Sequence, residues 1–194
     1  MNNKKLLLTV FAVVALVQLY VPAKMIWNRE VILKSGTEYK FKTAPIDPSD
    51  PFRGKYITLS FEENTVQIYN ETHWTSGEQI FVYLTTDKDG FAKIKSVSKE
   101  KPENDQEFLK AKVGFVTGDR PNNLTINYPF DRFYMEESKA PEAELMYQES
   151  QQDLNKITYA LVSIKNGYAV LKDVLIDGVS ISEIVNITRE GVKK

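Results

Sequence analysis

An uncharged, largely apolar run from Leu6 to Ala23 constrains this chain more than any other feature of its sequence. As an α-helix at about 1.5 Å per residue, the run is roughly 27 Å long, close to the hydrocarbon thickness of a bilayer. Lys4 and Lys5 precede it, and a basic flank favours the cytoplasmic side of a membrane. We therefore expect residues 1–27 to form a transmembrane anchor that keeps the N-terminus inside and places the rest of the chain outside the cytoplasm.

Two other interpretations of this run stay open. Val21-Pro22-Ala23 has the small or apolar residues of a signal-peptide cleavage site, although the run is longer than a usual signal core. A buried helix of a globular protein is the other possibility, but such a helix normally has a polar face, which this run lacks. Tyr20 and Trp27 lie where an aromatic belt is expected at a membrane surface, which favours a retained anchor.

Length and composition limit the rest of the chain. Its 194 residues suffice for the anchor and one domain, which we place at residues 28–187, followed by a polar tail at 188–194. The formal net charge is −1, with 25 basic and 26 acidic residues, so the composition does not favour nucleic acid as a partner. Cysteine is absent and His73 is the one histidine, so we expect no disulfide, no metal centre and no cofactor.

Short stretches of strand-forming residues, separated by turn signals, recur throughout the domain. The expected strands are Val31–Lys34, Tyr39–Thr43, Tyr56–Phe61, Thr65–Tyr69, Gln79–Thr85, Phe91–Val97, Phe108–Thr117, Leu124–Tyr128, Arg132–Met135, Ile157–Lys165, Tyr168–Ile176 and Ile181–Ile187.

Turn chemistry predicts how some of these strands pair. Asp89-Gly90 and Asn166-Gly167 each lie between two expected strands and favour tight hairpins. We also expect Thr65–Tyr69 to return antiparallel beside Tyr56–Phe61. The composition of Glu136–Ser150 predicts one short helix, because proline is accepted in a first turn. The predicted fold is mainly β: a transmembrane helix followed by an antiparallel β-sandwich or barrel-like domain with one short helix.

Two stretches are candidates for a partner or ligand surface, because each combines charged side chains with aromatic ones or with a rigid turn. The first is a proline-stiffened turn and the strand after it, with Asp47, Asp50, Arg53, Gly54 and Tyr56. The second is Asp131–Lys139, with Asp131, Arg132, Tyr134, Glu137 and Lys139.

Structural roles for these residues also stay open. The aspartates of the turn can cap backbone N–H groups while Arg53 neutralises them, and a divalent cation would need more oxygen ligands than this turn offers. The charges of Asp131–Lys139 can equally be those of a solvated strand end.

No catalytic constellation is evident in the sequence. His73 lies in a polar, loop-like stretch, and no Gly-x-Ser-x-Gly elbow is present. A faint similarity to serine–lysine peptidases places Ser49 without a positioned base, and a serine needs such a base to act as a nucleophile. We therefore expect a protein that is not an enzyme.

Three stretches resemble one known family. Gly54-Lys55-Tyr56-Ile57-Thr58-Leu59-Ser60-Phe61 is similar to the motif that names the bacterial GDYXXLXY proteins, with Lys55 and Phe61 where the motif has Asp and Tyr. Asp131–Lys139 is similar to the family's Glu-Arg-Tyr-Phe-x-Pro-Glu-Gly-Lys segment, and Leu171–Gly178 to its C-terminal hairpin strand. The resemblance implies a membrane-anchored protein, often encoded beside multi-spanning membrane proteins, and brings no established activity.

These observations lead to a functional hypothesis with two alternatives. We expect a single-pass protein of the bacterial inner membrane whose extracytoplasmic domain docks, as an accessory subunit, on a multi-spanning partner. One alternative is a ligand-binding or sensing domain for envelope glycans or peptides, for which Tyr56, Tyr134 and Trp74 would line a cleft. The other alternative is a hydrolase.

Overall fold

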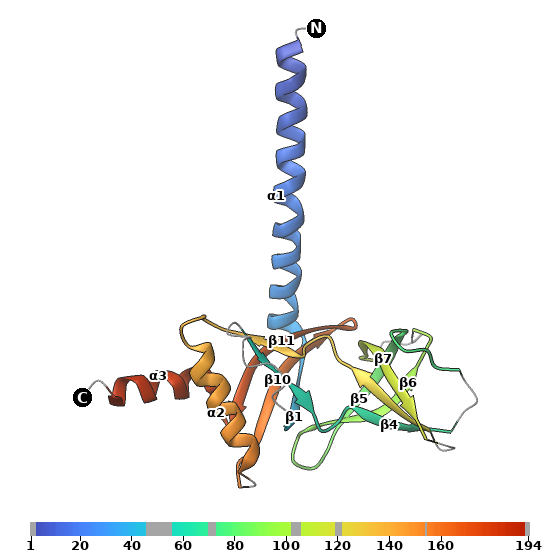
Figure 1. Cartoon of the computed structure of the whole chain (residues 1–194). Coiled ribbons are helices and arrows are strands. Elements are labelled where there is room, and N and C mark those ends of the chain that lie inside the picture. The colour runs from blue at the N-terminus through green and yellow to red at the C-terminus, as the bar shows by residue number, and fades with distance from the viewer. Residues whose placement is uncertain are drawn as a thin grey trace.

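The computed structural model describes residues 3–45, 56–69, 73–101, 106–118, 122–153 and 155–192. Its N-terminal helix α1 (Asn3–Ser35) stands out from a β-rich body as a long rod (Figure 1). The helix is long and apolar enough to cross a membrane, and no part of its most apolar window is buried in the protein. The expected strand at Val31–Lys34 is wrong, because these residues continue α1.

Within the described ranges, the strands form two five-stranded sheets and one two-stranded ribbon, all with antiparallel neighbours. The first sheet has the order β12 (Val179–Ser180), β11 (Tyr168–Ile176), β10 (Thr158–Lys165), β1 (Thr37–Ala44) and β3 (Ser60–Phe61). The second has the order β4 (Thr65–Ile68), β8 (Asn122–Asn127), β7 (Leu109–Thr117), β5 (Gln79–Thr86) and β6 (Ala92–Ser98). The ribbon pairs β2 (Tyr56–Thr58) with β9 (Arg132–Tyr134).

Two isolated bridges join the five-stranded sheets into a nearly closed, barrel-like body. Lys40 of β1 pairs with Phe91 before β6, and Leu109 of β7 pairs with Gly167 between β10 and β11. One continuous core fills the space between the sheets, with fully buried side chains such as Phe41, Val113 and Leu124. The expected fold class, mainly β with an N-terminal apolar helix, is confirmed.

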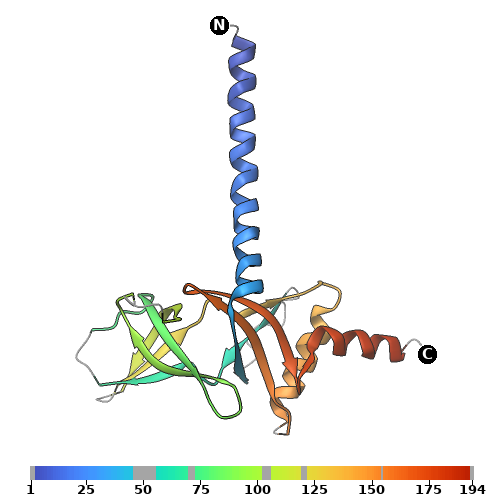
Figure 2. The same ribbon diagram turned by 180° about the vertical axis from the view of Figure 1, so that it is seen from behind.

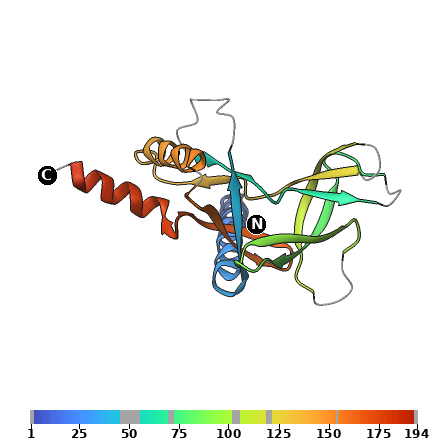
Figure 3. The same cartoon turned by 90° about the horizontal axis from the view of Figure 1, so that it is seen from below.

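In the part of the chain that the structure describes, two helices rather than one belong to this body. The expected helix at Glu136–Ser150 is α2 (Ala140–Gln152), with Pro141 in its first turn. The second, α3 (Ile181–Val192), replaces the expected strand Ile181–Ile187 and takes in most of the expected polar tail. Seen along α1 (Figure 3), α2 and α3 lie on one side of the body and the β4–β8 sheet on the other.

Strand pairing agrees with the sequence where it is local. The expected hairpins β5–β6 and β10–β11 are present, and Figure 2 shows β10 and β11 running from the base of α1 toward α3. The expected pairing of Thr65–Tyr69 with Tyr56–Phe61 is wrong. β3 instead joins β1, and β4 joins β8, a strand far away in the sequence.

The junction between α1 and β1 is tight. The N–H of Gly36 donates to the carbonyl of Ile32 at 2.8 Å, and a Cβ at position 36 would lie 2.8 Å from the carbonyl oxygen of Ile164 in β10. Lys165 donates to the hydroxyl of Ser35 at 2.6 Å, and Ile32 is buried. The end of α1 is therefore packed directly on the first sheet, without a loop between them.

Candidate functional site

The ribbon brings the two candidate stretches together. Tyr56 pairs with Tyr134, Ile57 with Phe133, and Thr58 with Arg132. Because side chains alternate along a strand, Ile57 and Phe133 point into the core, where both are buried. Tyr56, Arg132 and Tyr134 lie on the opposite face, and we call these three residues the ribbon patch.

The ribbon patch is a cluster of two aromatic rings and a guanidinium group. The rings of Tyr56 and Tyr134 lie 5.3 Å apart at an angle of 54°, and the guanidinium carbon of Arg132 lies 5.1 Å from the centre of the Tyr56 ring. Hydrogen bonding to Tyr134, and then interaction with Tyr56 and with the charge of Asp131, raise the pKa of Arg132. Tyr134 is 64% exposed, so most of its side chain is available for contact.

Behind the ribbon, the strand that follows it contributes to an aromatic cluster. Leu59 donates its N–H to the carbonyl of Asp131 at 2.8 Å, which extends the ribbon pairing by one residue. The ring centre of Phe61 lies 5.7 Å from that of Phe41 and 5.3 Å from that of Phe130. The last position of the motif thus holds a buried ring, which explains why phenylalanine suits it here.

A small groove of about 330 Å³ opens beside the ribbon, lined in part by Leu59, Ser60 and Asp131. Asp131 therefore lies at the edge of the ribbon patch. Asp47, Asp50, Arg53 and Gly54, the other candidates of the first stretch, lie outside the described residues.

The second stretch is a strand from Arg132 to Tyr134, one residue shorter than the expected strand Arg132–Met135. Glu137 and Lys139 belong to the turn before α2, and Lys139 forms an ion pair with Glu136 at 3.0 Å. Glu137 is exposed on the same turn.

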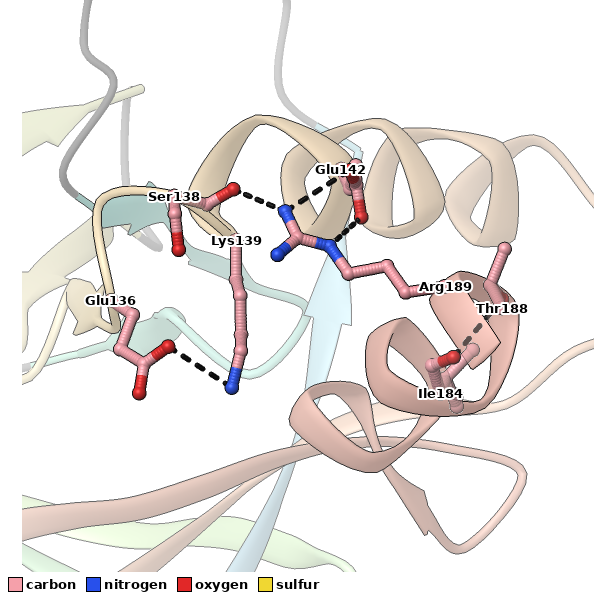
Figure 4. A network of polar contacts seen from close by, with 7 residues as sticks. All are labelled: Glu136, Ser138, Lys139, Glu142, Ile184, Thr188 and Arg189. Carbon is pink, nitrogen blue, oxygen red and sulfur yellow. Dashed lines mark hydrogen bonds and ion pairs between the residues drawn. The ribbon is translucent and has the colours of Figure 1, made fainter. Parts of the chain in front are cut away.

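Arg189, which the sequence analysis missed, holds this turn to α3 (Figure 4). Its Nε and Nη2 donate to the carboxylate of Glu142 in α2 at 2.7 and 3.0 Å, and Nη2 also donates to the carbonyl of Ser138. Hydrogen bonding from Arg189 lowers the pKa of Glu142. The i, i+3, i+4 spacing of Ile181, Ile184 and Val185 was the signal for a helix that carries Arg189.

Trp74 does not join the two tyrosines. It precedes β5, and its ring lies under the ammonium of Lys99, 5.2 Å from the ring centre, next to the Lys99–Glu78 ion pair of 2.8 Å. Tyr56 and Tyr134 belong to the ribbon, and neither the groove beside the ribbon nor a second groove beside β7 is lined by any of the three aromatic residues.

No metal-binding group is present in the described part of the chain, where no cluster of three or more histidine, aspartate or glutamate side chains occurs. The backbone carbonyl of His73 accepts a hydrogen bond from Lys99 at 2.6 Å. The chemistry that the ribbon patch offers is noncovalent: aromatic contact area and a stacked cation, the residue types that dominate protein interfaces.

Comparison with known proteins returns one family. The family model described as GDYXXLXY protein matches residues 18–174, a range that includes the second half of α1, the ribbon and all but the last residues of β11. Neither the curated proteins nor the solved structures return a match.

Proposed function

The chain belongs to the GDYXXLXY family, and from this premise we propose that it is a non-enzymatic accessory subunit of a multi-spanning membrane protein. In this proposal α1 is a retained single anchor in the inner membrane of a bacterium, with the N-terminus in the cytoplasm. The β-rich domain lies outside the cytoplasm and docks on its partner through the ribbon patch.

The exposed cation and rings of the ribbon patch carry this proposal. Tyrosine and arginine are enriched among the residues that contribute most to interfaces, because they bury a large area and retain polar groups. In the patch these residues are held in place by pairing with each other and by the buried side chains of Ile57 and Phe133 behind them. A partner that covers Tyr134 gains contact area without having to order a flexible loop.

The length of α1 supports a partner that also lies in the membrane. At about 1.5 Å per residue, the helix continues roughly 18 Å beyond Ala23 before it ends at Ser35. This segment carries exposed apolar side chains, among them Ile26 and Trp27. The domain therefore stands close to the bilayer, within reach of the extramembrane loops of a multi-spanning protein.

Site-specific photo-crosslinking tests the proposal. A photoreactive phenylalanine analogue replaces Tyr134 in the full-length protein, and the native membranes are irradiated before solubilisation. We expect one multi-spanning protein to be the main adduct, identified by mass spectrometry. Arg132→Ala in the same protein is expected to lower the adduct yield about tenfold, the scale of an interface hot spot.

Tyr69 provides the matched control, since it is 74% exposed and follows β4, in the other sheet. The same analogue at position 69 is expected to give little or none of this adduct. Equal adducts at positions 69 and 134, or a yield that Arg132→Ala leaves unchanged, contradict docking through the ribbon patch.

A further inference from the structure

A second groove, of about 480 Å³, opens where the tip of the β10–β11 hairpin meets β7. The tip turns through Asn166 and Gly167, which have φ values of 53° and 82°. The carbonyl of Gly167 accepts the N–H of Lys110 at 2.9 Å, and a Cβ at position 167 would lie 2.3 Å from the ring of Phe108. The tip therefore lies directly against β7, and the groove runs along this contact.

Polar side chains form a row across the floor of this groove. Lys112 of β7 has Gln79 of β5 opposite it on one side and Asn127 of β8 on the other. Directly paired residues project from the same face of a sheet, with Cβ atoms about 5 Å apart. Two residues with amide side chains thus flank Lys112, and all three residues line the groove.

A second lysine and a tyrosine extend the row. Lys110 lies two residues before Lys112 and therefore on the same face, roughly 7 Å away along the strand. Its ammonium lies 4.0 Å from the centre of the Tyr168 ring, and Tyr168 is 60% exposed. The groove thus offers two cations beside a largely exposed tyrosine.

Among the described residues, no carboxylate neutralises these cations. The residues that line the groove include no aspartate or glutamate, and within the described ranges Lys110 and Lys112 form no ion pair. Other sheet lysines are paired: Lys172 with Glu38 and Lys93 with Glu63, both at 2.6 Å. Like charges two residues apart on one face of a strand repel each other, and an anion between them relieves the repulsion.

We infer that this groove, formed by Lys110, Lys112, Gln79, Asn127 and Tyr168, binds the phosphate or carboxylate group of an acidic saccharide. The anion lies between the two lysines, the amides donate to it, and the sugar ring packs against the part of the Tyr168 side chain that Lys110 leaves exposed. This site is separate from the ribbon patch and does not depend on docking.

The position of the groove argues against a phospholipid as the source of the anion. Tyr168 pairs with Lys165, which donates to Ser35 at the end of α1, so the groove lies beside the base of the helix. That base is roughly 18 Å beyond the apolar run, whereas the headgroup layer extends about 5–8 Å beyond the hydrocarbon. With α1 perpendicular to the membrane, the lipid phosphates lie closer to the bilayer centre than the groove does.

Calorimetric titration of the full-length protein in phosphatidylcholine nanodiscs tests the inference, with glucose 6-phosphate as the probe. We expect binding that weakens with added salt, and binding of glucose and of inorganic phosphate that is about tenfold weaker or undetectable. The double variant Lys110→Ala/Lys112→Ala is expected to weaken binding of glucose 6-phosphate by about tenfold or more, since each lysine supplies a charge-assisted hydrogen bond.

Lys172→Ala is the matched control, because Lys172 lies in β11, in the hairpin that borders the groove, and already has a carboxylate partner. The affinity of this variant for glucose 6-phosphate should equal that of the wild type. Thermal unfolding checks that each variant is folded. No heat of binding at millimolar glucose 6-phosphate, or wild-type affinity in the double variant, overturns the site. Inorganic phosphate binding as tightly as glucose 6-phosphate overturns the role of the sugar. Loss of glucose 6-phosphate binding in phosphatidylglycerol nanodiscs overturns the saccharide assignment in favour of a lipid headgroup.

Discussion

The ribbon patch and the groove both place a cation on a tyrosine ring, yet they are built differently. In the ribbon patch, Arg132 lies on Tyr56 within one pair of adjacent strands, and the reverse side of those strands is core. In the groove, Lys110 and Tyr168 belong to elements of different sheets that touch at the hairpin tip. The patch therefore depends on the packing behind it, whereas the groove depends on one contact between distant segments.

Phe133→Ala is expected to have the largest effect, and it acts on the ribbon alone. Removing this buried ring leaves a cavity under the patch and should lower the free energy of unfolding by about 3–5 kcal/mol, as for other buried phenylalanines. Denaturant titration measures the loss. Tyr134→Ala, on the exposed face of the same strand, should change stability by less than about 0.5 kcal/mol. Similar losses in the free energy of unfolding for the two variants would show that Phe133 does not pack into the core beneath the ribbon patch as described.

Gly167→Ala is expected to act on the groove. It should lower the free energy of unfolding by about 2 kcal/mol, because it strains the backbone and displaces the Phe108 ring. Gly90→Ala separates these two causes, because Gly90 has the same φ of 82° but no atom within 4 Å of its Cβ position. In denaturant titration, Gly90→Ala should lower the free energy of unfolding by only about 1 kcal/mol. Equal losses at the two glycines would mean that the tip does not depend on its contact with Phe108.

Arg132→Lys sharpens the comparison at smaller cost. Lysine keeps the charge but loses the flat guanidinium that lies over the Tyr56 ring, so the free energy of unfolding should change by less than about 0.5 kcal/mol. The crosslinking yield at position 134 is nevertheless expected to fall severalfold, because the guanidinium group is lost from the interface. Retention of the full yield would show that the patch uses only the charge. Binding of glucose 6-phosphate should be unaffected.

The smallest expected effect is a pH dependence that belongs to neither surface. Arg189 lowers the pKa of Glu142 below its ordinary value of 4.5, so this ion pair stabilises the folded state above that pH. The contribution disappears as the pH falls through the lowered pKa. The difference in free energy of unfolding between the wild type and Glu142→Gln should be constant from pH 7 to about 5. It should disappear in more acidic buffer. A difference that persists at pH 2 would assign the effect to another cause.

Local features of the sequence predicted most of the fold. Asp89-Gly90 and Asn166-Gly167 predicted two hairpins correctly, since the turn chemistry lies within a few residues of the strands that it joins. The pairing of β4 with β8 was missed, because nothing near Thr65–Ile68 specifies a partner almost sixty positions away. The strand predicted at Ile181–Ile187 failed because its apolar residues fit two periodicities, and packing against α2 and β11 selects the helix.

The candidate surfaces were predictable to a different degree. Tyr56, Arg132 and Tyr134 could be named from their residue types, but their meeting on one face depends on the register of two distant strands. The groove was not predicted at all. Lys110 and Lys112 look like ordinary solvated lysines of a strand, and only the sheet reveals that Gln79 and Asn127 flank Lys112 and that no aspartate or glutamate is among the described residues that line the groove.

The junction at Gly36 has a consequence for how this domain is aimed. Because α1 continues into β1 without a hinge, the azimuth of the ribbon patch around the membrane normal is fixed by the helix itself. One residue added to the segment between Ala23 and Ile32 would lift the domain by about 1.5 Å and swing it by about 100°. The number of residues in this segment therefore determines the direction in which the ribbon patch faces around the helix axis.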